Sequence, residues 1–176
     1  MTALYIGRHA KPSKKTWFED ERRARAFLIP AWGNRPINSI TRDDVAALHV
    51  RIGMMRKGPK DRGGKYTANR VRELIQTMFN CAITWGMLEP NHMNPGKGIT
   101  EFKEVERSRF VSEDEMERLS AVITEEKNVY LRAAIWLYLL TGLRKVELLG
   151  ALWSDVDFGG RILFIQPERT KTNEAL

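Results

Sequence analysis

The sequence predicts a mainly α-helical protein, and three observations support this class. Apolar residues recur at steps of three and four, most regularly between Val71 and Trp85, as they do along one face of a helix. Thr41 and Ser112 each begin a Ser/Thr-x-x-Asp/Glu motif, which is typical of helix N-termini. A single short β-pattern, at residues 161–165, lies near the C-terminal end. We therefore expect helices along most of the chain and the beginning of a β-hairpin at its end.

The bulk composition describes a globular protein outside the membrane. The chain has 176 residues, of which 43% are hydrophobic and 29% are charged. No apolar run approaches the ~20 residues that cross a bilayer, and the N-terminus lacks a signal-peptide core. The lone Cys81, which falls in step with an apolar face, excludes a disulfide framework and a multi-cysteine metal site. We therefore expect a cytoplasmic protein with no membrane contact and no bound metal.

The positive charge is concentrated in the first part of the chain. Through Val105 there are 19 Lys and Arg residues against 10 Asp and Glu residues, whereas 10 basic and 12 acidic residues follow. A domain with such an excess typically binds a polyanion, and nucleic acid is the commonest one. The alternative is a generally basic surface without a specific partner.

The first hundred residues are expected to form one helical domain, preceded by an arm at residues 1–13. A helix from Thr16 to Leu28 is predicted to end at Pro30, with Asp20 on its outer face. Its inward residues are predicted to be Trp17, Ala24, Phe27 and Leu28. A second helix follows Thr41, and its apolar stripe is formed by Val45, Leu48 and Ile52.

A basic loop, RKGPKDRGGK at residues 56–65, separates the second helix from the longest one. Its glycine spacing does not match a phosphate-binding loop, and no strand precedes it, so a nucleotide site is rejected. The loop either contacts a DNA backbone or is simply solvated charge. The long helix is predicted to begin at Thr67 and to end at Gly86. Its first turns are expected to display Asn69, Arg70 and Arg72 toward phosphates or base edges.

The second domain is expected at residues 111–176, after a linker at residues 101–110. Ser112 begins its first helix, and residues 131–140 are apolar almost all round, as in a buried helix. The segment LLTGLRKVELLGALW follows, and in it Arg144 and Glu147 lie one helical turn apart. The apolar residues of this segment are expected to form one buried face: Leu143, Val146, Leu149 and Leu152. Residues 155–160 then form a turn, and the strand at residues 161–165 has no evident partner.

Two sequence blocks closely resemble the phage integrases, the tyrosine recombinase family. The first is TGLRKVELLGALWSDVDF, which is followed by the short strand and TKT. The second is the upstream block TANRVRELIQTMFNCAITWGMLEPNHMNP, and the resemblance extends over nearly the whole chain from about Lys14. The resemblance implies a SAM-like helical core-binding domain at residues 1–100. It also implies the helical and β-hairpin beginning of a catalytic domain at residues 111–176.

The resemblance also implies a chemistry and partners. Members of this family clamp double-stranded DNA and assemble with other protomers on it. A tyrosine attacks a phosphodiester to give a 3′-phosphotyrosyl intermediate, without metal or nucleotide cofactor. By position, Arg144 resembles the first active-site arginine, Glu147 its acidic companion, and Lys171 the lysine that protonates the leaving hydroxyl. The residues expected to contact DNA are Lys14, Lys15, Lys65, Asn69, Arg70 and Arg72.

The sequence departs from the family pattern after the lysine. All three histidines and all four tyrosines precede Arg144, so the family's His-x-x-Arg block and tyrosine nucleophile have no counterpart here. We therefore expect these 176 residues not to cut DNA by themselves. Three interpretations remain open. The chain is an integrase truncated as an experimental fragment or a prophage gene remnant, a non-catalytic DNA-binding module or regulator derived from an integrase, or an unrelated helical protein.

Overall fold

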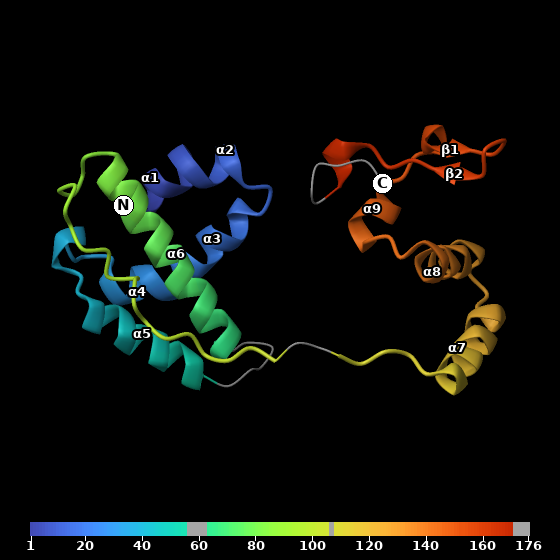
Figure 1. Ribbon diagram of the computed structural model, residues 1–176, viewed down its shortest axis with the longest axis horizontal. Helices are drawn as coiled ribbons and strands as arrows, with labels where there is room; N and C mark the ends of the chain where they lie inside the picture. The colour runs from blue at the N-terminus through green and yellow to red at the C-terminus, as the bar shows by residue number, and fades with distance from the viewer. Residues whose placement is uncertain (56–62, 106–107, 171–176) are drawn as a thin grey trace. The chain divides into compact units, whose positions relative to one another are not determined.

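The computed structural model describes residues 1–55, 63–105 and 108–170, and it divides into two compact units. Unit 1 comprises Met1–Arg107 and unit 2 comprises Ser108–Leu176. Figure 1 shows that helices make up most of each unit, with one small hairpin in unit 2. The predicted mainly α-helical class is confirmed.

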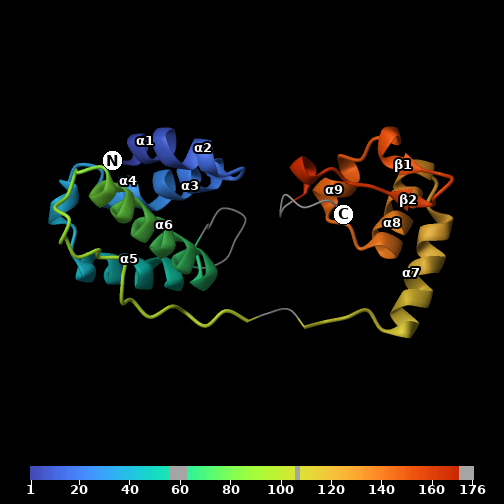
Figure 2. The same ribbon diagram turned by 45° about the horizontal axis from the view of Figure 1, so that its top comes forward.

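Unit 1 is built around a long central helix, α6 (Lys65–Thr84), which packs most extensively against α5 (Arg42–Met54). Two views show shorter helices on the other sides of α6 (Figures 1 and 2). The apolar stripes predicted for α5 and α6 are buried as expected. The core comprises Tyr5, Ile6, Ala10, Ala24, Phe27, Leu28, Val45, Leu48, Ile52, Ala68, Val71, Leu74, Ile75, Met78, Phe79, Ala82 and Leu88.

The ends of α5 and α6 follow local sequence signals. Thr41 begins α5 with a complete capping box, in which its hydroxyl accepts the Asp44 N–H and the Asp44 carboxylate accepts the Thr41 N–H. Gly86 follows the end of α6 at φ +69°, a conformation that glycine adopts without strain. The N-cap of α6 was predicted three residues too late, because Gly64 rather than Thr67 occupies it. Cys81 is half-buried on α6, and burial raises the pKa of its thiol.

The predicted N-terminal arm is wrong, because residues 2–13 are helical. They form α1 (Thr2–Tyr5), a π-helical turn (Ile6–Ala10) and α2 (Lys11–Ser13). In the π-helical turn the Lys11 N–H donates to the Ile6 carbonyl, five residues back. This winding places Tyr5 and Ala10 on one buried face, and their spacing of five does not match an α-helical pattern.

The next helical segment continues past Pro30, where it was predicted to end. It comprises α3 (Trp17–Arg23), a second π-helical turn (Ala24–Leu28) and α4 (Ile29–Trp32). Pro30 lies in the first turn of α4, directly after the change of winding, where a proline is tolerated. A 3₁₀ turn (Ile37–Ser39) then leads to α5. Asp20, predicted on the outer face of α3, is instead buried.

After α6 the chain turns back and runs antiparallel along that helix. The Asn94 side chain donates to the Gln76 carbonyl at 2.8 Å, and further along the Phe102 N–H donates to the Asn69 side chain at 3.0 Å. Figure 1 shows this returning segment beside α5 and α6. The first residues of the predicted 101–110 linker are thus attached to unit 1.

Unit 2 contains α7 (Glu113–Glu125), α8 (Val129–Thr141) and the short α9 (Lys145–Leu149). The Ser112 capping box is formed as predicted, with the Ser112 hydroxyl accepting the Glu115 N–H. The predicted burial is wrong, however, because α8 has no buried residue among those described. The apolar face predicted around α9 is largely exposed too, with Val146 78% exposed. Those apolar side chains have few neighbours within the described part of unit 2.

The predicted strand has a partner upstream, which corrects the expectation that it lacked one. After a 3₁₀ turn (Trp153–Asp155), β1 (Val156–Asp157) pairs antiparallel with β2 (Ile162–Leu163), so that Val156 faces Leu163. Residues 156–157 were predicted to belong to a turn, but the tight Asp157–Gly160 bend makes them a strand. A last 3₁₀ turn (Pro167–Arg169) follows the hairpin.

Among residues 1–55, 63–105 and 108–170, no helix combines the length and the apolarity that a membrane span requires.

Candidate functional site

Arg144 is placed by the turn between α8 and α9. Gly142 ends α8 in the left-handed conformation, at φ +65°, and its N–H donates to the Tyr138 carbonyl at 3.0 Å. Arg144 is extended, at φ −71° and ψ 151°, and is the residue before α9. The Thr141–Gly142 turn therefore ends α8, and Arg144 occupies the N-cap position of α9.

Glu147 fixes the position of Arg144 through two hydrogen bonds. Its side chain is only 3% exposed, and one carboxylate oxygen accepts the Arg144 backbone N–H at 2.8 Å. The other oxygen accepts an N–H of the Arg144 guanidinium at 3.0 Å. The Arg144 side chain remains 54% exposed. One edge of the guanidinium is thus fixed to a buried carboxylate, while the rest is accessible.

The exposed part of Arg144 lines a hollow of about 430 Å³ within unit 2. The other lining residues are Thr141, Gly142, Leu143, Glu147 and Leu163. A guanidinium presented in this way can donate parallel hydrogen bonds to two oxygens of a phosphate. Arg144 is therefore placed where an anion can reach it.

Lys171 lies outside the described residues, and the turn before it is held in place by Arg169. The Arg169 guanidinium donates to both carboxylate oxygens of Asp155, each at 2.6 Å, and to the Gly150 carbonyl at 2.9 Å. These bonds to Arg169, with the Leu152 N–H, hold the pKa of Asp155 below its usual value of 3.8. Arg169 thereby ties the end of the hairpin to the end of α9.

In unit 1, Lys14 belongs to a small buried network. Its ammonium group donates to the Asp20 carboxylate at 2.7 Å and to the Tyr5 hydroxyl at 3.1 Å, and the Tyr5 hydroxyl also donates to Asp20 at 2.9 Å. Burial raises the pKa of Tyr5 to about 12. Lys14 therefore joins the N-terminal helices to α3.

Asn69 does not lie on the surface, which corrects its predicted place in a DNA-contacting turn. It is fully buried, and its amide group donates to the Phe102 carbonyl and to Glu104, each at 2.8 Å. Its carbonyl oxygen accepts the Phe102 N–H and lies 3.0 Å from His49 Nε2, so His49 is the donor in that pair. Asn69 thus holds the returning segment to α6.

Arg70 and Arg72 reach the surface of α6, but acidic side chains engage both. Arg70 donates to Glu73 at 2.8 Å and to Glu104 at 3.0 Å, and its guanidinium lies 5.0 Å from the Tyr66 ring centroid. Arg72 donates to Glu101, to Gln76 at 2.8 Å and to the Gly96 carbonyl at 3.3 Å. No local pattern in the sequence indicates Glu104 or Glu101 as partners, because they lie 34 and 29 residues from Arg70 and Arg72.

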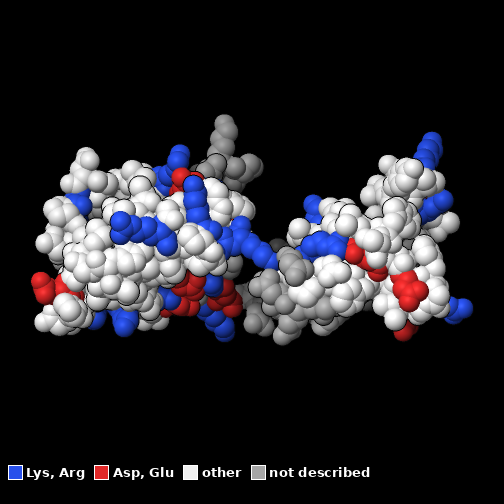
Figure 3. Space-filling model, turned by 90° about the horizontal axis from the view of Figure 1, so that it is seen from above, with Lys and Arg blue, Asp and Glu red and all other residues white. Residues whose placement is uncertain are grey.

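The remaining predicted cations, Lys15 and Lys65, are exposed. The sequence reasoning missed two further exposed cations, Arg8 and Lys11, because their segment was assigned to an arm. Figure 3 shows Lys and Arg side chains across the middle of the visible face of unit 1, with most of the visible Asp and Glu side chains nearer its lower edge. Unit 1 therefore presents several cations on one face.

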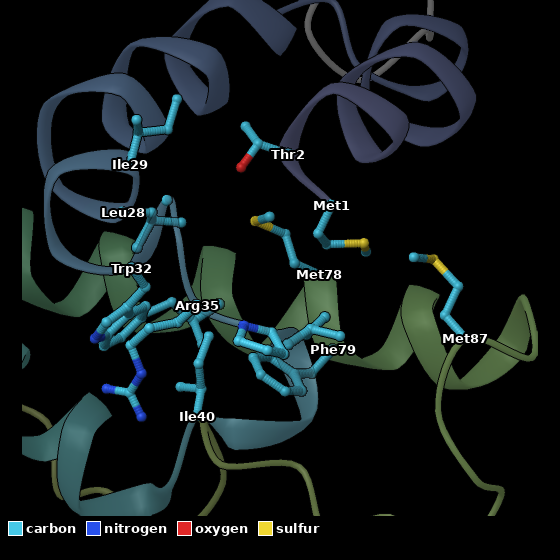
Figure 4. A pocket seen from close by; sticks show the side chains of 14 residues that line it. Met1, Thr2, Leu28, Ile29, Trp32, Arg35, Ile40, Met78, Phe79 and Met87 are labelled. Atoms are coloured by element: carbon cyan, nitrogen blue, oxygen red, sulfur yellow. The ribbon is translucent and has the colours of Figure 1, made fainter.

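A separate cavity of about 310 Å³ lies within unit 1 (Figure 4). Its walls are mainly apolar and include Leu28, Trp32, Met78 and Phe79. Its charged lining residue, Arg35, donates to both oxygens of Asp44 at 2.9 Å. Within the ranges that the structure describes, no three His, Cys, Asp or Glu side chains are arranged to hold a metal ion.

The C-terminal part of the chain matches a known protein family. Residues 109–176 match the phage integrase family. The integrase of Escherichia phage lambda is 28% identical over 141 residues, which is 80% of this chain and 36% of that protein. A XerC-like tyrosine recombinase of Caldanaerobacter subterraneus is 31% identical over 104 residues, which is 57% of this chain and 26% of that protein. The chain thus spans about a third or less of these relatives.

Solved structures show the same fold. A lambda integrase tetramer bound to a Holliday junction aligns with 99% of this chain at a TM-score of 0.72 and 23% identity, over 49% of that chain. The Tn1549 transposon integrase in complex with transposon right-end DNA aligns with 94% of this chain at a TM-score of 0.71 and 24% identity, over 50% of that chain. These alignments extend over both units.

Proposed function

Because this chain is related to the phage integrases, the tyrosine recombinase family, we propose that it forms the DNA-binding part of a site-specific integrase. In this proposal unit 1 is a core-binding domain that holds duplex DNA, and unit 2 is the beginning of a catalytic domain. The proposed partners are double-stranded DNA and other integrase protomers assembled on it. The 176 residues contain no histidine or tyrosine after Arg144, so we expect them to bind DNA without cleaving it.

The observation that carries the proposal is the arrangement of Arg144 over Glu147. A buried carboxylate holds one edge of the guanidinium, so the side chain keeps its direction without losing access to solvent. A preorganised donor of this kind stabilises the negative charge that develops on a phosphate during strand transfer. In a complete site we expect Arg144 to bind the scissile phosphate, Glu147 to position it, and Lys171 to protonate the leaving hydroxyl.

The charge of unit 1 supports the DNA-binding part of the proposal. Its exposed cations include Arg8, Lys11, Lys15 and Lys65, and the basic excess through Val105 lies entirely in this unit. Contacts between such cations and phosphates release counterions from DNA, which makes the affinity strongly dependent on salt. A non-catalytic regulator that occupies integrase sites is the second candidate, and the same charge distribution favours it.

The proposal is tested by electrophoretic mobility shift on random duplex DNA across a salt series. Three to five phosphate contacts predict an affinity that falls on the order of 10²-fold between 50 and 200 mM salt. Salt-independent or absent binding would contradict the proposal and favour an unrelated helical protein. A nicked suicide substrate run in parallel is expected to show no covalent adduct, and an adduct would contradict the non-cleaving assignment.

A pair of variants separates the roles of the two units. The double variant Lys15→Glu and Lys65→Glu changes two exposed residues of unit 1 and is expected to weaken binding by at least tenfold. Arg144→Ala is expected to weaken binding less, because it removes one phosphate contact. Equal losses from both variants would argue against unit 1 as the main DNA-binding surface.

A further inference from the structure

Residues 94–104 form what we call the strap, the returning segment that lies along α6. Ile99 and Phe102 of the strap pack against the core of unit 1, and hydrogen bonds with specific side chains fix its path. Asn94 donates to the Gln76 carbonyl and to the Asn80 side chain, each at 2.8 Å. At the other end, Asn69 exchanges two hydrogen bonds with the Phe102 backbone, at 2.8 and 3.0 Å. The strap is therefore docked in a defined register.

Two close approaches show that the groove is shaped for this segment. The Phe102 ring stacks on His49, with centroids 4.6 Å apart and planes inclined by 17°. A Cβ atom on Gly53 would lie 2.4 Å from the Phe102 ring, and one on Gly96 would lie 2.9 Å from the α6 backbone at Gln76. Glycine at these two positions lets the strap lie against α5 and α6.

The strap brings two carboxylates onto the basic start of α6. Glu101 binds Arg72, and Glu104 binds both Arg70 and Asn69. The pKa of Glu104 is lowered by Asn69 and then by Arg70, so its carboxylate is charged at neutral pH. The Nε–H groups of Arg70 and Arg72 are buried without a partner among the described residues. The strap thus neutralises both guanidinium groups but leaves each one incompletely hydrogen-bonded.

We propose that the strap is an internal competitor of DNA, in which Glu101 and Glu104 occupy the positions that DNA phosphates take on Arg72 and Arg70. This inference depends on the proposed DNA-binding function of unit 1. Glu104 and Glu101 each accept from their arginine through a single carboxylate oxygen, whereas the two non-bridging oxygens of a DNA phosphate can accept two parallel hydrogen bonds from one guanidinium. DNA binding and strap docking are then mutually exclusive at these two arginines, and the strap lowers the affinity of the resting protein.

The first test removes the charges of the strap in the full chain. Glu101→Gln with Glu104→Gln is expected to bind duplex DNA about 3- to 10-fold more tightly, since two ion pairs no longer compete. The log–log salt slope is expected to steepen by about 1 to 2, because two more phosphates are engaged. The matched control is Glu89→Gln with Glu125→Gln, two exposed acidic residues outside the strap, which makes the same change in net charge. We expect its effect to stay within about twofold.

The second test detaches the strap without altering charge. Gly53→Ala places a methyl group against the Phe102 ring, while alanine itself favours the helical backbone of α5. This variant is expected to raise DNA affinity in the same direction as the charge variant. Hydrogen exchange of the Phe102 N–H gives an independent readout and is expected to speed up when duplex DNA is added to the unaltered chain. The Asp44 N–H, held by Thr41, is the internal reference.

The outcomes separate this inference from the proposed function. One outcome is that the unaltered chain binds DNA in a salt-dependent way while neither variant gains affinity over the control and Phe102 exchange stays unchanged. That result would overturn the proposal that the strap competes with DNA, and would leave the DNA-binding function intact. Failure of the unaltered chain and of both variants to bind DNA would overturn both proposals together.

Discussion

Unit 1 and unit 2 are stabilised by different kinds of residue. Unit 1 has a continuous apolar core that runs from Tyr5 to Leu88. In the described part of unit 2 the buried apolar residues are Ile123 and Ile165, and three polar residues are buried with them: Glu147, Asp155 and Thr170. Hydrophobic burial therefore dominates the stability of unit 1, whereas caps and ion pairs determine the shape of unit 2.

The largest expected difference between the units comes from the same substitution made in each. Phe79→Ala removes a core ring of unit 1 that is 3% exposed, so the free energy of unfolding should fall by about 3–5 kcal/mol. Phe158→Ala removes a ring of unit 2 that is 75% exposed, and should change that free energy by less than about 1 kcal/mol. Urea denaturation, with hydrogen exchange to resolve the two units, measures both changes. Similar losses of unfolding free energy in the two variants would contradict the difference between the cores of the two units.

A smaller effect is expected from Asn69, and it distinguishes a structural role from DNA contact. Asn69→Ala leaves the His49 donor and the Phe102 N–H without their acceptor, so we expect a loss of about 2–3 kcal/mol in unit 1. Asn91→Ala, on the surface of the same unit, is the control and should have little effect. Urea unfolding without DNA measures both variants. An unchanged midpoint for Asn69→Ala would return this residue to the list of possible DNA contacts.

The two capping boxes should contribute about equally, in spite of the difference between the cores. Thr41→Ala and Ser112→Ala each remove the hydroxyl that accepts a backbone N–H at a helix N-terminus, which costs about 1 kcal/mol. Hydrogen exchange of the Asp44 and Glu115 amides should report the two losses separately. A much smaller loss at Ser112 would show that α7 forms only in part, and would sharpen the contrast between the units.

Changes of pH are expected to have the smallest effects on stability, with high pH destabilising unit 1 and low pH destabilising unit 2. The pKa of Tyr5 is raised, so its contribution to unit 1 is fully present below pH 10 and is lost as the pH rises toward about 12. The pKa of Asp155 is lowered, so its contribution to unit 2 is present above pH 3.8 and is lost as the pH falls below that value. Thermal melting of Tyr5→Phe and Asp155→Asn should remove the alkaline and acidic components respectively. An unaltered pH profile in either variant would contradict the corresponding assignment.

The sequence predicted what depends on near neighbours and missed what depends on distant ones. The apolar stripe of α6, both capping boxes and the Arg144–Glu147 pair are set by residues within a few positions, and these features are present. The burial of Asn69 depends on Phe102, which no local pattern connects to it. Likewise, the apolar pattern of residues 131–140 predicted a helix correctly but could not show whether anything covers it.

The prediction for the N-terminal segment was wrong for a different reason. The buried residues of this segment are Tyr5, Ile6 and Ala10, and only Ile6 and Ala10 have an α-helical spacing, which is too little for a periodic pattern. The π-helical turn adds Tyr5 to the same buried side, and Arg8 and Lys11 are exposed on unit 1. The candidate site was thus predictable at Arg144, where a family motif covers it, and only partly predictable on the basic surface.

The reactivity of the Cys81 thiol can report local unfolding of unit 1. The chain contains one cysteine, on the central helix, where partial burial raises the pKa of the thiol and so lowers the fraction of reactive thiolate. A thiol reagent will therefore label the folded chain slowly and the opened chain quickly. The rate of labelling, measured in the presence and absence of duplex DNA, therefore reports the local opening of α6 without an engineered probe.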